Sequence, residues 1–191
     1  MVLQEAKAIA EKIREDLLPH CYRCEIAGSV RRKKHEVKDI EIVIIPKPYE
    51  TGLFTSGIAA IIGQWQKVKG ELGPECRYTQ RIHPGGIKID IFFARPENWG
   101  LIFAIRTGSS EYSRVELACR WVARGYHSRN GMLESGNSHE VIELREEEDL
   151  FKLLGITFIK PENREVGFEN GYTTGSRSDL KWLTDKDYHG K

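Results

Sequence analysis

The sequence lacks any long hydrophobic run, which excludes a membrane span built from a helix. No apolar stretch approaches the roughly 20 residues that such a span requires. The first 18 residues are amphipathic and contain several acids, a pattern typical of neither a signal peptide nor a transit peptide. We therefore expect an intracellular protein, cytoplasmic or virus-associated, that is not secreted and has no membrane partner.

Cysteine is also scarce, with four residues in 191. Cys21 and Cys24 form a CxxC pair, but Cys76 and Cys119 do not supply the second close pair that a structural zinc site needs. The CxxC pair leads into an expected strand, whereas a thioredoxin-like motif should open a helix. We expect buried or incidental thiols, although a metal or redox role for the pair stays open.

The sequence has almost no excess of either charge. Its 29 Lys and Arg residues against 28 Asp and Glu residues leave a formal net charge of +1, so composition does not indicate a polycation that coats nucleic acid. The charges are nevertheless segregated, with a basic cluster at residues 31–38 and an acidic block at 140–149. A basic cleft can therefore exist within a neutral total.

The chain is 40% hydrophobic and 30% charged, which is an ordinary globular balance. Apolar periodicity, Gly and Pro then predict alternating helices and strands with no internal repeat. The expected helices are residues 4–18, 58–69, 98–106, 109–124 and 146–154. The expected strands are residues 22–28 and 40–45, a hairpin over 77–94 and a small hairpin around 129–131. Residues 167–191 are expected to form a flexible tail.

Three acids in expected strands carry the strongest chemical signal. Asp39 and Glu41 are two residues apart at the start of a strand, so their side chains point to the same face. Asp90 interrupts an apolar strand, where an unpaired buried charge is costly. If the two strands are neighbours, the three carboxylates converge and offer the hard oxygen ligands that Mg²⁺ prefers. The alternative is that these acids lie at a solvent-exposed edge of the sheet and have no catalytic function.

A second signal precedes the acids. Gly28 and Ser29 follow a strand, and Arg31 and Arg32 come next. A glycine at such a turn lets backbone N–H groups approach a phosphate, and Arg offers a planar fork for phosphate oxygens. The alternative is a plain turn followed by a solvated basic run. The two signals in this order predict a phosphate cradle beside a metal site.

These motifs together resemble the nucleotidyltransferase signature of DNA polymerase family X, in the polymerase beta-like superfamily. Residues 27–32 (AGSVRR) and 38–43 (KDIEIV) match its first element without a gap, and residues 87–91 (IKIDI) resemble the strand that bears its third carboxylate. Residues 106–109 (RTGS) resemble its hinge, and residues 147–165 resemble its closing segment. The resemblance is to the minimal viral-type members that have no lyase domain.

The resemblance implies an α+β fold. A nucleotidyltransferase palm with a mixed, mainly antiparallel sheet is expected over residues 1–105, and a small C-terminal subdomain of helices and a hairpin over 106–166. It further implies a monomeric DNA-directed DNA polymerase that adds dNMP to a primer 3′-OH and fills short gaps in DNA repair. Its cofactor would be two Mg²⁺ ions, with Mn²⁺ as a substitute, and its partners would be primer-template or gapped DNA and dNTP.

The resemblance also assigns roles to residues. The catalytic metal ligands would be Asp39, Glu41 and Asp90. The nucleotide would be bound by Gly28, Ser29, Arg32, Thr107, Gly108, Ser110 and Ser113. The DNA would be contacted by Arg31, Lys33, Lys88, Arg114 and Arg120, although each Arg of the 109–124 helix could equally lie on a solvated face.

The sequence departs from the family pattern at the hinge, where Ile105 and Arg106 replace an aromatic pair that helps to exclude ribonucleotides. Two alternatives to a DNA polymerase stay open. One is a nucleotidyltransferase that acts on RNA, a small molecule or a protein, because the palm signature is shared. The other is a non-catalytic module that binds DNA ends.

Overall fold

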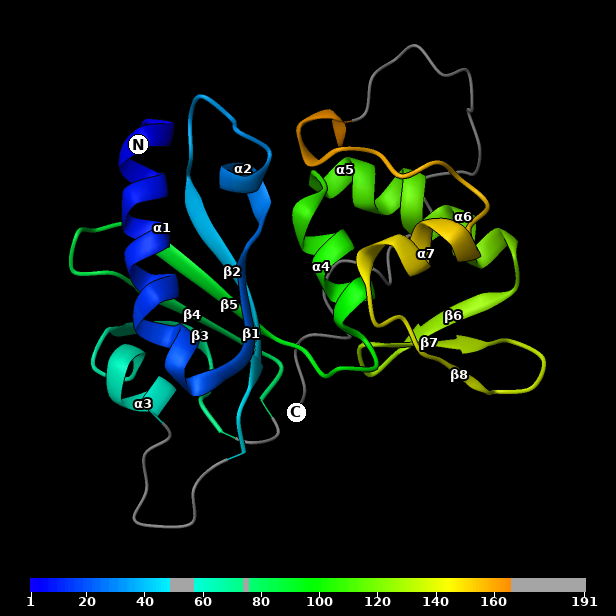
Figure 1. Cartoon of the computed structure of the whole chain (residues 1–191), viewed down its shortest axis with the longest axis horizontal. Helices are drawn as coiled ribbons and strands as arrows, with labels where there is room; N and C mark the ends of the chain where they lie inside the picture. Colours follow the sequence, from blue (N-terminus) through cyan, green and yellow to red (C-terminus); the bar gives the residue numbers. More distant parts are fainter. Residues whose placement is uncertain (49–56, 74–75, 166–191) are drawn as a thin grey trace.

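The computed structural model describes residues 1–48, 57–73 and 76–165, and these form two lobes (Figure 1). The expected tail at 167–191 lies outside the described residues. No described helix is both long enough and apolar enough to traverse a bilayer.

The large lobe is built on a five-stranded sheet with the strand order β1-β2-β5-β4-β3. Only β2 and β5 run parallel, and the other three neighbouring pairs are antiparallel. The predicted mixed, mainly antiparallel sheet is therefore confirmed. The strands are β1 (Cys21–Ile26), β2 (Asp39–Pro46), β3 (Gln66–Gly70), β4 (Tyr78–Ile82) and β5 (Lys88–Phe93).

Helices cover both faces of this sheet (Figure 1). α1 (Leu3–Leu17) and α3 (Gly57–Ile62) pack on one face against the isoleucines of β2 and β5. α4 (Trp99–Thr107) packs on the other face, where Trp99, Ile102 and Phe103 contact Val43 and Phe92. Alternate residues of β2 therefore enter different cores, as the period of a strand requires.

The same helix α4 also supplies Leu101 and Ala104 to the core of the small lobe. The boundary predicted at residue 106 thus falls inside a helix that both lobes share. The small lobe contains α5 (Ser110–Tyr112), the π-helical segment η2 (Ser113–Ala118), α6 (Cys119–Ala123) and α7 (Glu147–Leu153). Its sheet has the order β6 (Tyr126–Arg129), β7 (Met132–Ser135), β8 (Val141–Ile142).

Three short helical turns complete the described chain. They are η1 (Leu18–His20), α2 (Gly28–Arg31) and η3 (Pro161–Asn163). The first turn begins just before Pro19, which ends α1 as predicted. Ser109 caps α5 by accepting a hydrogen bond from the backbone N–H of Tyr112 at 3.1 Å, which confirms the expected start of this helical stretch.

The helix predicted over residues 58–69 is wrong in its second half. α3 ends at Ile62, Gly63 and Gln64 form a turn, and β3 begins at Gln66. β3 lies at the sheet edge, and all five of its residues are exposed. Because neither face of β3 is buried, its sequence carries no alternation that identifies a strand.

Candidate active site

The parallel pairing of β2 and β5 brings the three predicted acids onto one face of the sheet. Glu41 lies directly opposite Asp90, and Asp39 lies opposite Lys88. This register confirms that the two acid-bearing strands are neighbours. Asp90 is buried, while Asp39 and Glu41 are partly exposed.

The environment of Glu41 and Asp90 disfavours the charged form of these two carboxyls. Burial raises the pKa of Glu41 to about 7; Arg106 opposes this shift, while the negative charges of Asp39 and Asp90 add to it. Burial also raises the pKa of Asp90 above its ordinary value, although hydrogen bonds from Tyr78 and Gln80 lower it in part. The cluster therefore gains stability from any cation that binds beside it.

Two side chains of β4 hold Asp90 in place. The Tyr78 hydroxyl donates a hydrogen bond to Asp90 Oδ1, and Gln80 Nε2 donates to the same oxygen at 2.9 Å. Gln80 is the register partner of Asp90 in the antiparallel β4–β5 pair. Neither residue was predicted from the sequence, although the predicted hairpin places Gln80 opposite Asp90 and Tyr78 opposite the neighbouring Phe92.

Gly28 is required by its position at the start of α2. Its φ of +58° lies in the left-handed region that favours glycine. A Cβ at this position would lie 1.9 Å from Glu41 Oε2, so any side chain would displace that carboxylate. Beside it, Ser29 Oγ is buried and has no hydrogen-bond partner among the described residues. The predicted turn therefore places the backbone of Gly28 directly against the Glu41 carboxylate.

The expected convergence of the acids is only partly realised. Among the described residues, no group of three or more His, Cys, Asp or Glu side chains is arranged to hold a metal ion. The carboxylate of Glu41 packs over Gly28, and Asp90 is bound to Tyr78 and Gln80. The donor set still fits a hard divalent cation, because three carboxylates share one face of two strands in register.

A cleft of about 300 Å³ opens between the acids, α4 and the small lobe. Arg106 lies over the Phe92 ring, 4.0 Å from its centroid, in the cation–π range. It enters the cleft beside Glu41 and lowers the pKa of that carboxyl. The predicted site residues that line the cleft are Asp39, Glu41, Arg32, Gly108, Ser110, Ser113 and Arg114.

Other predicted residues lie elsewhere and make different contacts. Thr107 is fully buried, so it does not face the cleft, and its carbonyl accepts a hydrogen bond from Arg32 at 2.7 Å. Lys33 pairs with Glu162, and Arg120 pairs with Glu116 at 2.7 Å. Lys88 is exposed beside the acids.

Arg31, which was predicted to contact DNA, makes an ionic contact within the protein. Its guanidinium forms a bidentate ion pair with Glu147 at 2.8 and 2.9 Å and donates to Thr107 Oγ1. Glu147 also accepts a hydrogen bond from Arg164, which is fully buried. Arg31 thus belongs to an ionic triad, Arg31–Glu147–Arg164, that joins the two lobes, and its contact with DNA stays a prediction.

Opposing effects set the charge state of this triad. Burial acts to raise the pKa of Glu147, but the hydrogen bonds and charges of Arg31 and Arg164 outweigh it and hold the pKa below the ordinary value. Glu147 is thus an anion between two cations. Further ion pairs between the lobes are Arg32–Glu165, Lys33–Glu162, Lys34–Glu165 and Arg23–Glu146.

Comparison with known proteins agrees with this architecture. Residues 103–165 match the family described as DNA polymerase beta thumb. The structure is similar to that of polymerase beta from Leishmania infantum in a ternary P/T complex, with a TM-score of 0.67 and 17% identity, covering 87% of this chain and 77% of that one. The chain has a polymerase beta-like fold.

A second structure of the same enzyme, in a ternary gap complex, is also similar. Its TM-score is 0.64 at 17% identity, covering 86% of this chain and 70% of that one. No curated protein sequence matches significantly. Residues 103–165, which match the thumb family, include the small lobe, and the large lobe, with the acids at the start of β2, belongs to the rest of the shared fold.

Proposed function

We propose that this polymerase beta-like protein transfers nucleotides from dNTP to the 3′-OH of a DNA primer, in short-gap repair synthesis. The observation that carries the proposal is the in-register pairing of Glu41 and Asp90, with Asp39 on the same face. Asp39 and Glu41 line a cleft that also contains Arg32 and Arg114, and Asp90 lies beside them in the sheet. Carboxylates for a cation beside guanidinium groups for phosphate form the donor set that phosphoryl transfer needs. The solved complexes of similar fold, named as P/T and gap complexes, support DNA as the partner.

The residues have distinct proposed roles. Asp39, Glu41 and Asp90 would hold two Mg²⁺ ions, which supply charge neutralisation at the attacking and leaving oxygens. Arg32 and the N–H groups near Gly28 would bind the triphosphate, and Ser29 Oγ is a buried hydroxyl beside them without a protein partner. Lys88, opposite Asp39, would contact a primer phosphate. The small residues of the cleft wall, Gly108, Ser110 and Ser113, leave room for the nucleotide.

A primer-extension assay tests this function. Gapped, nicked and single-stranded DNA would each be combined with dNTP and Mg²⁺, and an RNA primer with rNTP would be run in parallel. We expect extension of gapped DNA that EDTA abolishes. Transfer to RNA alone would establish the other nucleotidyltransferase function, and DNA binding without transfer under any condition would establish a non-catalytic module.

DNA affinity should fall steeply as salt rises. Because the net charge is only +1, binding must come from local cations such as Lys88 and Arg114, and each phosphate contact releases counterions. The logarithm of the association constant should decrease linearly with the logarithm of salt, with a slope of about −0.9 for each contact. Fluorescence anisotropy of a labelled gapped duplex measures this slope, and a binding constant independent of salt would contradict the prediction.

Rejection of ribonucleotides should be measurable but weaker than in relatives with an aromatic hinge pair. Ile105 lines the cleft, and Arg106 is turned onto Phe92, so neither supplies an aromatic ring beside the sugar. The backbone near Gly108 would then press alone on a 2′-OH. The ratio of kcat/KM for dNTP over rNTP should rise on Ile105→Tyr. An unchanged ratio would show that this position does not set sugar choice.

A further inference from the structure

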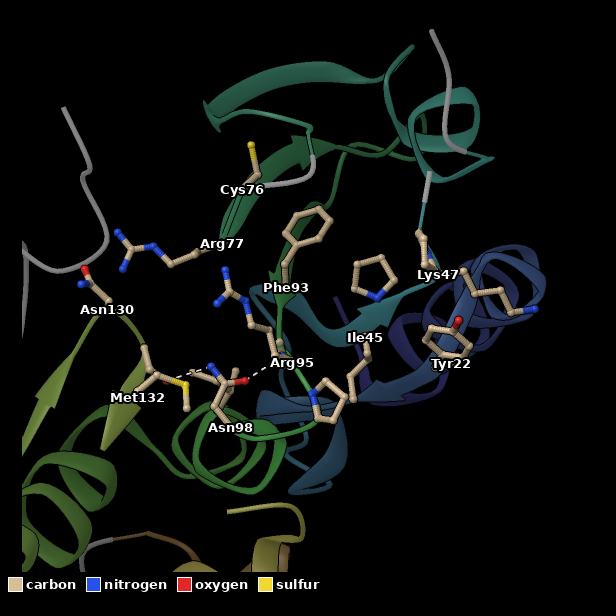
Figure 2. Close-up of a pocket in the computed structure, with 16 residues that line it drawn as sticks. Tyr22, Ile45, Lys47, Cys76, Arg77, Phe93, Arg95, Asn98, Asn130 and Met132 are labelled. Atoms are coloured by element: carbon tan, nitrogen blue, oxygen red, sulfur yellow. Dashed lines mark hydrogen bonds between the residues drawn. The ribbon is translucent and has the colours of Figure 1, made fainter. Parts of the chain in front are cut away.

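A second, larger pocket lies outside the carboxylate cleft and has no role in the proposed reaction. Its volume is about 560 Å³, within the range of sites for small ligands. It lies by the carboxyl ends of β2 and β5, whereas Asp39 and Glu41 lie at the start of β2 (Figure 2). Its far wall is the turn between β6 and β7, at Asn130 and Gly131.

Much of the lining is apolar and includes two aromatic rings. Ile45, Phe93 and Ile102 come from the large lobe and α4, and Met132 comes from the small lobe. Tyr22 is 67% exposed, a large value for an aromatic side chain. Exposed aromatic rings are the surfaces on which nucleic-acid bases stack, and such stacking tolerates any base.

The charged lining residues are all cations. Lys47, Arg77 and Arg95 come from three separate segments, and among the described residues no Asp or Glu lines the pocket. In Figure 2 the side chains of Arg77 and Arg95 extend on the side of Phe93 that faces Asn130. Lys47 contributes from the other end and donates a hydrogen bond to the Pro19 carbonyl at 2.8 Å. A local charge of this sign selects for an anionic ligand.

A buried amide fixes the wall between these cations and the small lobe. Asn98 accepts a hydrogen bond from the Arg95 backbone N–H at 2.7 Å and donates one to the Gly131 carbonyl at 2.8 Å. Asn98 is itself buried. The backbone of Arg95 is thereby held to the β6–β7 turn, so the pocket has a fixed shape on this side.

The pocket adjoins the carboxylate cleft. Ile102 and Gly131 line both spaces, so one side of each residue faces the acids' cleft and the other faces the pocket. The cleft and the pocket therefore share a wall.

We propose that this pocket binds one unstacked nucleotide, with its base against Phe93 and Tyr22 and its phosphate near Arg77 and Arg95. A flat aromatic ring that carries a phosphate matches an apolar lining bordered by the cations Lys47, Arg77 and Arg95. The same chemistry belongs to a free mononucleotide and to a nucleotide within single-stranded DNA. The proposal does not depend on nucleotidyl transfer by Asp39, Glu41 and Asp90.

The test measures binding in EDTA, which removes any contribution of divalent cations at the acids. The full chain is titrated with fluorescein-labelled thymidine hexanucleotide and, in parallel, with labelled thymidine monophosphate, and anisotropy is recorded. Two variants address the pocket: Arg77→Gln with Arg95→Gln removes charge, and Met132→Trp fills the space. Lys7→Gln with Lys12→Gln on α1 is the matched control, because it removes two exposed cations from the opposite side of the sheet.

Both pocket variants should weaken binding about tenfold or more, the effect of losing one stacking or phosphate contact, while the control should stay within about twofold. Binding of the monophosphate would identify a free nucleotide as the ligand, and binding of the hexanucleotide alone would identify a DNA strand as the ligand. Either outcome supports nucleotide binding in the pocket. Affinity unchanged in both pocket variants, or equal displacement by inorganic phosphate or polyglutamate, would overturn it. Retained hexanucleotide binding by a parent chain that shows no primer extension with Mg²⁺ would refute the proposed function and leave the pocket intact.

Discussion

Asp90→Asn should lower nucleotide addition by at least about a thousandfold, a loss of roughly 4 kcal/mol of transition-state stabilisation, if this acid holds a catalytic cation. The substitution removes one charge without changing the shape of the side chain. The Asn Oδ1 can still accept the hydrogen bonds that Tyr78 and Gln80 donate to Asp90. The fold should therefore persist while activity disappears.

Single-turnover extension of a gapped primer measures the effect, and circular dichroism and DNA affinity measure the fold. Asp16→Asn is the matched control, because Asp16 is an exposed acid of α1 that forms an ion pair with Lys12 on the same helix. It should retain full activity. Turnover of the Asp90→Asn variant within tenfold of the parent, or full activity of the parent in EDTA, would refute the metal-dependent mechanism.

Glu147→Gln should lower the free energy of unfolding by about 3–5 kcal/mol, the usual cost of removing one partner from a buried ion pair. Glu147 is 4% exposed and Arg164 is fully buried, so the arginine charge would stay in a low-dielectric environment without its anion. Arg31 would lose the same partner, and the two lobes would lose their most buried ionic contact. Urea unfolding followed by circular dichroism measures the change.

Glu162→Gln is the control for this experiment. Its partner Lys33 also spans the two lobes, but both side chains are exposed, so the loss should be at most about 1 kcal/mol. Equal effects of the two substitutions would show that burial does not decide the strength of these pairs.

Glu147→Gln should also change how the free energy of unfolding depends on pH. Because the pKa of Glu147 is lowered in the folded state, its contribution is complete above the ordinary glutamate pKa and is lost as pH falls through the lower folded value. The parent should therefore lose more stability than Glu147→Gln between neutral pH and pH values below the ordinary glutamate range. Parallel pH profiles would argue against an ionised Glu147 in the folded protein.

The ionic triad helps to set the width of the cleft because it joins the two lobes. The cleft is formed by the large lobe, the shared helix α4 and the small lobe, so its width depends on how these parts are held. Arg31 and Arg32 are adjacent in sequence but have different tasks. Arg31 binds Glu147 across the lobes, whereas Arg32 lines the cleft and binds Thr107 and Glu165.

Sequence alone determined the strands that carry the acids. The dense isoleucine and valine content of β2 and β5 predicts strands, and the spacing of Asp39 and Glu41 predicts their common face, because a strand has a period of two residues. Gly28 was predicted for a turn, since a positive φ is open to glycine at little cost. These are local properties, and local sequence encodes them directly.

Tertiary structure alone decided the contacts between distant residues. The basic cluster at residues 31–38 predicts a DNA-binding surface, but the charge of Arg31 is paired with that of Glu147, which lies 116 residues away in the sequence. The hydrogen bonds that Tyr78 and Gln80 donate to Asp90 depend on the register of β4 against β5. The pocket of Phe93, Arg77 and Met132 exists only where the two lobes meet. Burial and charge pairing are properties of the packed chain, so no short stretch of sequence contains them.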